Sequence, residues 1–227
     1  MNIIEVKDLH KTYDTGKVKT QALRGTTLTI GEGEFTAIAG PSGSGKTTLL
    51  NLVGCLDAPT SGTIMVTGKK VNDLSETQLS NLRRDKIGFV FQAYNLIPVL
   101  TARENVEFVM LLQGVPDRER KERAEAILNE VGLSDYIDRR PPEMSGGQQQ
   151  RVAVARAIAA EPALVLADEP TANLDSTTGS ALLDLMRKLN EDKKVTFVFS
   201  THDRMVMERA TRLIHLRDGV VADDERR

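Results

Sequence analysis

The sequence predicts an α/β fold built on a mostly parallel sheet. Short, continuous apolar segments alternate with segments of helical periodicity, and strands that are apolar throughout are typical of parallel sheets covered on both faces. One such segment, Phe35–Ala39, runs directly into a glycine-rich loop and then a helix over Thr47–Val53. With 227 residues, 40% of them hydrophobic, the chain is long enough to form one well-packed domain.

The strands are predicted from apolar runs bounded by turn residues. Near the N-terminus, short strands separated by glycine-containing turns are expected at Ile3–Leu9, Leu28–Ile30 and Ile64–Val66. The buried strands of the main sheet are expected at Phe35–Ala39, Ile87–Phe91, Leu164–Ala167, Val195–Phe199 and Leu213–Leu216.

The middle of the chain, from Leu96 to Arg140, has no strand signal. A capping box at Thr101–Glu104 precedes the apolar run Val106–Leu112, and Gly114 is placed to cap the end of that helix. A second, highly charged helix is expected over Asp117–Val131, stopped by Gly132. The pattern therefore indicates a helical block inserted between two strands.

The loop after Phe35–Ala39 fits the phosphate-binding pattern G-x-x-x-x-G-K-[ST] at every fixed position from Gly40 to Thr47. Its glycines allow successive backbone N–H groups to converge on an anion, and the following helix points its positive end at the same place. Lys46 would contact the β- and γ-phosphates, and the Thr47 hydroxyl would bind Mg²⁺. A glycine-rich turn that binds nothing is the alternative, which the strand and helix on either side disfavour.

The strand Leu164–Ala167 is followed by two adjacent carboxylates, Asp168 and Glu169, at the sheet edge where α/β proteins bind ligands. Asp168 is expected to hold Mg²⁺, directly or through water, and Glu169 to polarise a water for attack on a γ-phosphate. Two acids at a strand end could instead cap the next helix, a reading that the nearby phosphate loop weakens.

Ser145-Gly-Gly-Gln148 precedes a helix expected over Gln149–Ala160. A Gly-Gly turn that opens a helix would form a second anion-binding site. The chain then has two phosphate-recognition elements but one phosphate loop. The simplest interpretation is a shared site, in which this element closes over a nucleotide held by another copy.

Composition excludes several other classes of protein. The net charge of −2 and an aromatic content of 4% without tryptophan argue against nucleic-acid binding. The single Cys55, expected in the core, excludes an internal disulfide and a multi-cysteine metal site. No apolar run approaches the length of a membrane span, and the N-terminus lacks a signal-peptide pattern, so a cytoplasmic location is expected.

Taken together, these motifs resemble the ATP-binding cassette ATPases over essentially the whole chain. Met144–Gln148 is similar to the family's Leu-Ser-Gly-Gly-Gln signature, with one apolar residue in place of another. The resemblance implies an α/β fold with a P-loop NTPase core, a mostly parallel sheet, an N-terminal antiparallel β subdomain and an inserted helical signature subdomain. It implies one nucleotide-binding domain over 1–227, with 1–92 and 163–227 forming the core and β subdomain and 93–162 the helical subdomain.

The same resemblance implies ATP hydrolysis, with ATP and Mg²⁺ as cofactors. Glu169 would be the catalytic base, His202 the switch histidine near the γ-phosphate, and Gln92 would reach Mg²⁺ and the attacking water, with Lys46 also catalytic. The ATP contacts would be Tyr13, Gly40, Pro41, Ser42, Gly43, Ser44, Gly45, Lys46, Thr47 and Thr48, and the Mg²⁺ ligands Thr47, Gln92 and Asp168. Contacts across the dimer would come from Ser145, Gly146, Gly147, Gln148 and Asp175. Tyr13, assigned to stack on adenine, could also be an ordinary surface or core tyrosine.

A finer similarity links the chain to the lipoprotein-release and macrolide-export group. It rests on the insertion from Asp14 to Arg24, the loop from Thr36 to Gly45, and Gln148-Gln-Gln-Arg-Val-Ala. It implies an ATP-dependent head-to-tail homodimer that drives a separate transmembrane permease subunit from the inner face of the membrane, for export or release of a substrate. The permease would dock near the segment Ala93–Val106. The alternative is a soluble member acting on a cytosolic assembly, such as iron–sulfur cluster assembly machinery.

Overall fold

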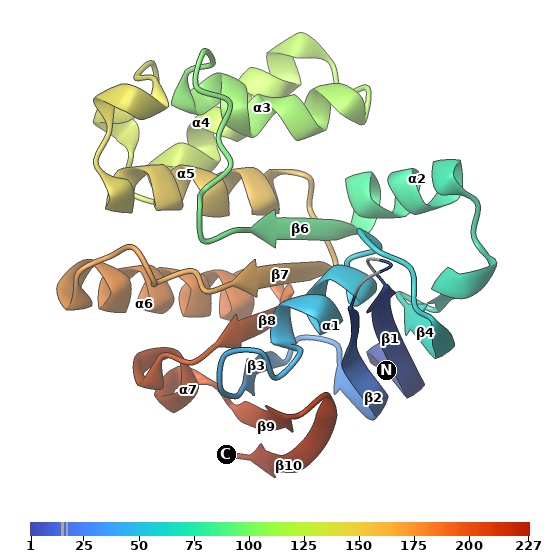
Figure 1. Cartoon of the computed structure of the whole chain (residues 1–227). Helices are drawn as coiled ribbons and strands as arrows, with labels where there is room; N and C mark the ends of the chain where they lie inside the picture. The colour runs from blue at the N-terminus through green and yellow to red at the C-terminus, as the bar shows by residue number, and fades with distance from the viewer. Residues whose placement is uncertain (15, 17) are drawn as a thin grey trace.

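The structure, a computed structural model, describes residues 1–14, 16 and 18–227 and contains a six-stranded and a four-stranded sheet (Figure 1). The larger sheet has the order β10-β9-β3-β8-β7-β6, and every pair from β9 to β6 is parallel. The smaller sheet, β2-β1-β4-β5, is antiparallel throughout. The predicted α/β fold with a mostly parallel sheet and an N-terminal antiparallel sheet is thus confirmed.

The strands of the smaller sheet are β1 (Asn2–Asp14), β2 (Lys19–Gly31), β4 (Ser61–Val66) and β5 (Lys69–Lys70). Those of the larger sheet are β3 (Phe35–Ala39), β6 (Ile87–Val90), β7 (Leu164–Asp168), β8 (Thr196–Thr201), β9 (Arg212–Arg217) and β10 (Val220–Arg226). The α-helices are α1 (Lys46–Val53), α2 (Glu76–Lys86), α3 (Ala102–Leu112), α4 (Asp117–Glu130), α5 (Gly146–Ala159), α6 (Ser176–Lys193) and α7 (Arg204–Arg209). Short 3₁₀ turns lie at Val71–Asp73, Ser134–Tyr136 and Pro141–Glu143.

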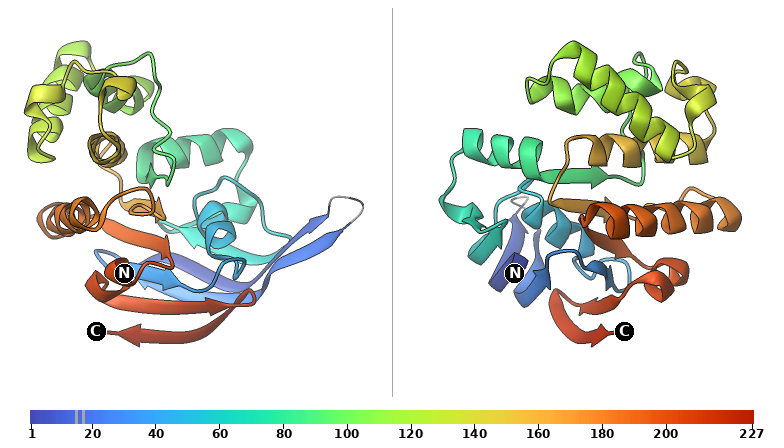
Figure 2. Two further views of the ribbon diagram at one scale, coloured as in Figure 1. Left: turned by 60° about the vertical axis from the view of Figure 1, so that its left-hand side comes forward. Right: turned by 180° about the vertical axis from the view of Figure 1, so that it is seen from behind.

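The first two strands are much longer than the predicted segments Ile3–Leu9 and Leu28–Ile30. Their pairing continues from Ile4 opposite Ile30 to Asp14 opposite Lys19, interrupted by register shifts. These irregularities break the alternation of apolar and polar residues on which a strand is recognised, so the outer half of the hairpin gave no sequence signal. Figure 2 shows this hairpin as a ribbon extending away from the rest of the molecule. Thr15 and Lys17, part of the insertion that carries the subgroup similarity, lie outside the described residues.

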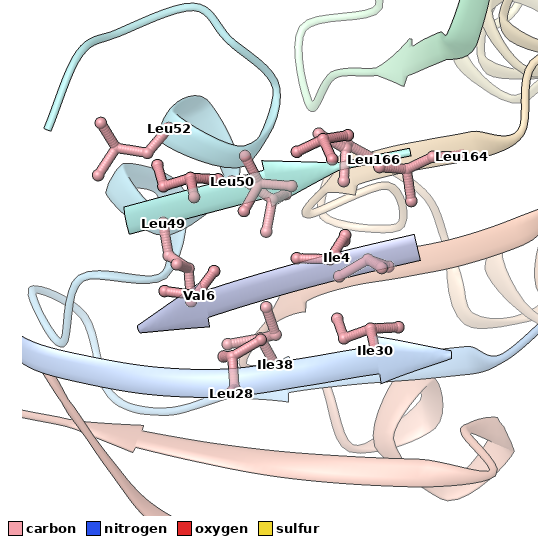
Figure 3. Packing of buried hydrophobic residues seen from close by; sticks show 14 of the residues in the cluster. Ile4, Val6, Leu28, Ile30, Ile38, Leu49, Leu50, Leu52, Leu164 and Leu166 are labelled. Atoms are coloured by element: carbon pink, nitrogen blue, oxygen red, sulfur yellow. The ribbon is translucent and has the colours of Figure 1, made fainter. Parts of the chain in front are cut away.

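One hydrophobic cluster fills the space between the two sheets around α1. Ile4 and Val6 of β1 and Leu28 and Ile30 of β2 pack toward Ile38 of β3, and leucines of α1 and β7 complete the layer (Figure 3). The α1 leucines are Leu49, Leu50 and Leu52, each 5% exposed or less. Cys55 is 4% exposed and joins this core, as expected. The helix that follows the glycine-rich loop is therefore anchored on both sheets.

The opposite face of the six-stranded sheet is covered by α6 and α7. Three aromatic rings, those of Phe35, Phe197 and Phe199, lie on this face with Phe35 and Phe199 centroids 4.6 Å apart. Leu182, Leu183, Met186 and Leu189 of α6 pack on them. Because both faces are buried, the central strands are apolar throughout, which is why the sequence showed them as continuous runs.

The helices α3, α4 and α5 form a third cluster above the edge strand β6 (Figure 1). The predicted capping box at Thr101 is present: its hydroxyl accepts from the Glu104 N–H, and the Glu104 carboxylate accepts from the Thr101 N–H. The predicted terminating glycine is also present: Gln113 is the C-cap residue, and Gly114 directly after it has φ +79°, the left-handed conformation that ends a helix. The second helix ends at Glu130 rather than Val131.

One strand, β10, had no sequence signal. It pairs antiparallel with β9 at the outer edge of the sheet. Its residues from Ala222 to Arg226 are all exposed, and the last four of them are charged. Arg212 of β9, 6% exposed, anchors it through two hydrogen bonds to Asp224, 2.8 and 2.7 Å long, and a third to Glu34 of 3.0 Å. A strand stabilised by charge pairs lacks the apolar pattern used for strand prediction.

The close approach of β6 to α5 gives the first testable prediction. A Cβ on Gly88 would lie 2.3 Å from the Ala157 carbonyl oxygen, a backbone atom that cannot move without shifting the helix. We expect Gly88→Ala to lower the free energy of unfolding by about 1–3 kcal/mol, measured by urea denaturation. The control is Gly179→Ala in α6, where the new Cβ would lie 3.5 Å from the Thr171 methyl group. That change should be neutral or stabilising, and equal losses for both variants would contradict the steric explanation.

Candidate functional site

Three loops meet at the carboxyl edge of the parallel sheet. They follow β3, β7 and β8, which are neighbours in the order β3-β8-β7. Pairing aligns Ala39 with Thr201 and Asp168 with Ser200, so the three strands end at one level. The glycine-rich loop, the carboxylates after β7 and the histidine after β8 are therefore brought together although more than a hundred residues of chain separate the first from the others.

The glycine-rich loop wraps around the first turn of α1. Gly45 has φ +101°, and a Cβ there would lie 2.6 Å from the Ala22 carbonyl oxygen, so both the backbone conformation and the close contact require glycine. The Lys46 side chain is buried and its ammonium donates to the carbonyl oxygens of Gly40 and Pro41, at 2.8 and 3.0 Å. The loop thus holds a positive charge in place at the N-terminus of a helix.

Thr47 and Asp168 bring together a hydroxyl and a carboxylate. The Thr47 hydroxyl donates to Asp168 Oδ1 at 3.2 Å, and this contact joins the first turn of α1 to the end of β7. Among the described residues no three His, Cys, Asp or Glu side chains gather in a metal-binding group. A hydroxyl beside one carboxylate nevertheless fits Mg²⁺, which takes few protein oxygens and completes its shell with water and substrate phosphates.

Glu169 is held in an unusual backbone conformation. Its φ is +46°, in the left-handed region that non-glycine residues seldom adopt, and its N–H donates to the Ser200 carbonyl oxygen at 2.9 Å. Its carboxylate lies 2.6 Å from His202 Nδ1 and accepts from the Thr201 hydroxyl at 3.3 Å. The Glu169 side chain is 14% exposed and that of His202 is 70% exposed. A carboxylate and an imidazole are thus fixed at the mouth of the site.

A pocket of about 390 Å³ joins these groups to the β1–β2 hairpin. Tyr13 contributes from β1, and burial raises the pKa of its phenol. The lining residues are Tyr13, Thr20, Gln21, Ala22, Ser42, Gly43, Gly45, Lys46, Thr47, Thr48, Glu169 and His202. A tyrosine at one end and a cationic, glycine-rich loop at the other suit a ligand with a planar group and an anionic tail. Gly40, Pro41 and Ser44 belong to the loop but do not line the pocket, since the first two bind Lys46 through their carbonyls and Ser44 is buried.

The remaining predicted site residues lie outside this pocket. Gln92 is exposed after β6, and its backbone carbonyl accepts from Asn173 Nδ2 at 2.9 Å. Asp175 is the N-cap of α6, where its carboxylate accepts from the N–H groups of Thr177 and Thr178. Of the residues described, none from Ser145 to Gln148 lines the pocket. A single chain therefore does not bring all of the predicted residues together.

The sequence pattern predicted a turn at the Gly-Gly pair, and this prediction is wrong. Gly146 and Gly147 are the first two residues of α5, and Ser145 caps the helix in a capping box with Gln148. A Cβ on Gly146 would lie 2.8 Å from the Tyr94 hydroxyl oxygen, the end of a side chain that can move aside, and one on Gly147 would lie 2.5 Å from the Thr178 methyl carbon. Contacts between residues so distant in sequence cannot be read from a local pattern.

Sequence reasoning also missed the side chains that hold the segment after β6. Gln150 of α5, fully buried, donates to the Pro170 carbonyl oxygen at 2.8 Å and to that of Phe91 at 3.5 Å. Arg156, one and a half turns further along, donates to the carbonyl oxygens of Tyr94 and Asn95. Burial lowers the pKa of the Arg156 guanidinium. Together with Asn173, these side chains tie residues 91–95 to the helix α5 and to the loop after β7.

Comparison with known proteins gives matches over nearly the whole chain. The family model described as "ABC transporter" matches residues 23–172. The lipoprotein-releasing system ATP-binding protein LolD 1 of Rhodopseudomonas palustris is 46% identical, covering 97% of this chain and 99% of that protein. The macrolide export ATP-binding/permease protein MacB of Syntrophobacter fumaroxidans is 48% identical over 97% of this chain, which spans 31% of that longer protein.

Among solved structures, the dimeric post-hydrolysis state of the ATP-binding cassette MJ0796 bound to ADP and Pi superposes with a TM-score of 0.91. It is 47% identical to this chain, and the match covers 98% of both chains. Over residues 1–14, 16 and 18–227, no helix combines the length and the apolar character needed to cross a bilayer.

The contacts of Arg156 lead to a prediction about the segment after β6. Tyr94 and Asn95 both have positive φ, +60° and +50°, so they depend on the hydrogen bonds that the guanidinium donates. We expect Arg156→Met to lower the free energy of unfolding by about 1–3 kcal/mol and to speed amide hydrogen exchange in residues 91–95. The control is Arg118→Met, which removes an arginine that is 91% exposed in α4. Unchanged exchange in residues 91–95 of the first variant would contradict the assigned contact.

Proposed function

Because the chain belongs to the ABC transporter family, we propose that it is the ATP-hydrolysing subunit of an export or release system, acting as a head-to-tail homodimer on a separate permease subunit. The observation that carries the proposal is the 2.6 Å contact between Glu169 and His202 at the mouth of the phosphate-loop pocket. A carboxylate held there can act as general base for hydrolysis of a terminal phosphate, and the imidazole beside it can orient that carboxylate.

In the proposed reaction the phosphate loop binds the triphosphate and Tyr13 stacks on the adenine. Lys46 exchanges the carbonyl oxygens of Gly40 and Pro41 for β- and γ-phosphate oxygens, a stronger, charge-assisted interaction. Mg²⁺, held by Thr47, Asp168 and Gln92, would neutralise phosphate charge. The backbone N–H groups of the loop and the start of α1 contribute further positive potential.

Glu169 is the proposed general base. It accepts a proton from a water molecule while the water oxygen forms a bond to the γ-phosphorus. The bond between that phosphorus and the β,γ-bridging oxygen breaks, and the bridging oxygen leaves on ADP with the electron pair. His202, hydrogen-bonded to Glu169, orients the carboxylate and contacts the γ-phosphate. Gln92 helps to position the attacking water.

The homodimer is proposed because one chain provides an incomplete site. Ser145, Gly146, Gly147 and Gln148 do not line the pocket, while the helix α5 begins at Gly146 with its N-terminus available to an anion. Asp175 lies in the loop that would cross the dimer. The related cassette MJ0796, described as a dimer with ADP and Pi, supports this arrangement.

The permease is proposed to dock on the helical part of the chain, near the predicted segment Ala93–Val106 and on the adjoining helix α3. Exposed apolar side chains gather there: Val99 is 71% exposed, Leu111 51%, Leu112 55% and Phe108 38%. A groove of about 550 Å³ beside Phe108 and Leu111 also contains charged residues of α3 and α4. A groove lined by both apolar and charged side chains suits an amphipathic segment from another protein.

The relatives named for lipoprotein release and macrolide export favour export or release as the direction of transport. The proposed location is therefore the inner face of the cell membrane, reached through the permease, and no nucleic acid is involved. The competing function is a soluble cassette acting on a cytosolic assembly such as the iron–sulfur machinery.

Substitution of the proposed base tests the shared site. We expect Glu169→Gln to reduce ATP turnover by roughly 10²–10⁴-fold while leaving ATP bound, because the amide cannot accept the proton. With Mg-ATP the variant should elute as a stable dimer in size-exclusion chromatography with light scattering. Glu191→Gln, in a surface ion pair with Arg187, is the control and should keep normal turnover. A variant that binds ATP yet stays monomeric would rule out the head-to-tail dimer.

The docking surface is tested by co-purification. Tagged Glu169→Gln chain, expressed in its source cell and extracted with mild detergent in Mg-ATP, should bring down a membrane protein. Adding Leu111→Arg should reduce that recovery at least about ten-fold, since it places a charge in an apolar contact. Adding Val220→Arg, at the edge strand β10, should not. Recovery of only soluble partners would instead favour the cytosolic-assembly alternative.

A further inference from the structure

Two charged residues outside the pocket surround the Tyr13 side chain. The Tyr13 hydroxyl donates to Asp57 Oδ2 at 2.9 Å. The Lys11 ammonium lies 4.7 Å from the centroid of the Tyr13 ring and donates to Asp57 Oδ1 at 2.7 Å and to the Ala58 carbonyl oxygen at 2.8 Å. The ring is therefore restrained both at its hydroxyl and over one face.

This arrangement follows from the local fold. Lys11 and Tyr13 are two residues apart on β1, so their side chains leave the strand on the same side. The loop after α1 that carries Asp57 is bound to the same strand, because the Thr60 N–H donates to the His10 carbonyl oxygen and the Thr12 N–H to the Thr60 hydroxyl, both at 2.9 Å. The carboxylate is thus brought to the ring by the contacts that Thr60, three residues further along, makes with β1.

The charged groups of Lys11 and Asp57 are hydrogen-bonded and partly shielded from water. The Lys11 side chain is 12% exposed and that of Asp57 is 30% exposed. Asp57 Oδ1 also accepts from the Ala58 N–H at 2.7 Å. Burial alone would raise the pKa of Asp57, but the hydrogen bonds from Lys11, Tyr13 and Ala58 outweigh it and hold that pKa below its ordinary value. The Asp57 carboxylate therefore stays ionised over the neutral pH range.

We infer that Lys11 and Asp57 are positioning residues for nucleotide binding, which hold the Tyr13 ring in the orientation that receives the base. This inference rests on the proposed function, since it assumes that ATP binds in the pocket lined by Tyr13 and the phosphate loop. Neither side chain lines that pocket, so each acts through the tyrosine ring.

The geometry also defines how the base is recognised. Lys11 covers one face of the ring, so a planar base stacks on the other face. The Tyr13 hydroxyl is already bonded to Asp57 and does not need a hydrogen bond from the base. Stacking is tolerant of base identity because every base has a π-face. Loss of Lys11 should therefore weaken ATP and GTP to a similar extent.

The test separates base binding from phosphate binding. We expect Lys11→Met to raise the Kd for ATP about three- to ten-fold, measured by isothermal titration calorimetry, and to leave the Kd for inorganic tripolyphosphate unchanged. Tripolyphosphate has no base, so its binding reports on the phosphate loop alone and reveals any general damage to the fold. Lys11→Arg, which keeps the cation, should restore most of the ATP affinity. The control is Lys70→Met, at a 48% exposed lysine on β5, which should alter neither Kd.

A double-mutant cycle completes the test. In a Tyr13→Ala background, Lys11→Met should have no further effect on the Kd for ATP, because the ring through which it acts is gone. A Lys11→Met effect that persists in that background, or an equal loss of tripolyphosphate binding, would overturn the positioning role. Unchanged ATP affinity in Lys11→Met alone would also overturn it while leaving the proposed function intact. If the unmodified chain bound no ATP, the proposed function itself would fail.

Discussion

Parallel pairing of β3, β8 and β7 is the constraint on which the rest of the structure depends. It sets the phosphate loop, the Asp168–Glu169 pair and His202 at one edge of the sheet, in a register that leaves Asp168 opposite Ser200. Parallel neighbours need long crossovers, and here those crossovers contain α6 and the whole helical block. Burial of both sheet faces, by α1 and the smaller sheet on one side and by α6 and α7 on the other, holds that edge rigid. The Glu169 backbone keeps its left-handed conformation because the sheet around it, including the hydrogen bond from its N–H to the Ser200 carbonyl oxygen, holds it there.

The helical block is connected to the sheet through apolar packing of α5 and through polar contacts at the segment after β6. Its main contact, α5, extends from the Gly146 and Gly147 packing against Tyr94 and Thr178 to the Arg156 hydrogen bonds with Tyr94 and Asn95. Hydrogen bonds to backbone carbonyls can be exchanged at lower cost than a packed apolar interface can be repacked. The hydrogen bonds that hold the segment from Phe91 to Asn95 are therefore the easiest of these contacts to exchange.

Local patterns predicted the parts of the fold and site that local chemistry determines. The strand Phe35–Ala39, the glycine-rich loop between it and the next helix, and the capping box at Thr101 depend on neighbours within a few residues, and all are present. The outer half of the β1–β2 hairpin, the strand β10 and the close packing at Gly147 depend on partners far along the chain. The same is true of Gln150, Arg156 and Asn173, which bind backbone carbonyls and so leave no residue-type pattern in their partners. Gln92, Asp175 and the signature residues were assigned by resemblance, and their roles stay predictions.

The charged strand β10 has a consequence for how the molecule behaves at high concentration. An unprotected β9 would present a row of free backbone N–H and C=O groups to any other extended chain, a common starting point for aggregation. β10 pairs with β9 and presents the charged residues from Asp223 to Arg226 at the new edge, and charged side chains on an edge strand disfavour pairing with a further strand. Non-productive sheet-to-sheet assembly is thus discouraged at this side of the molecule.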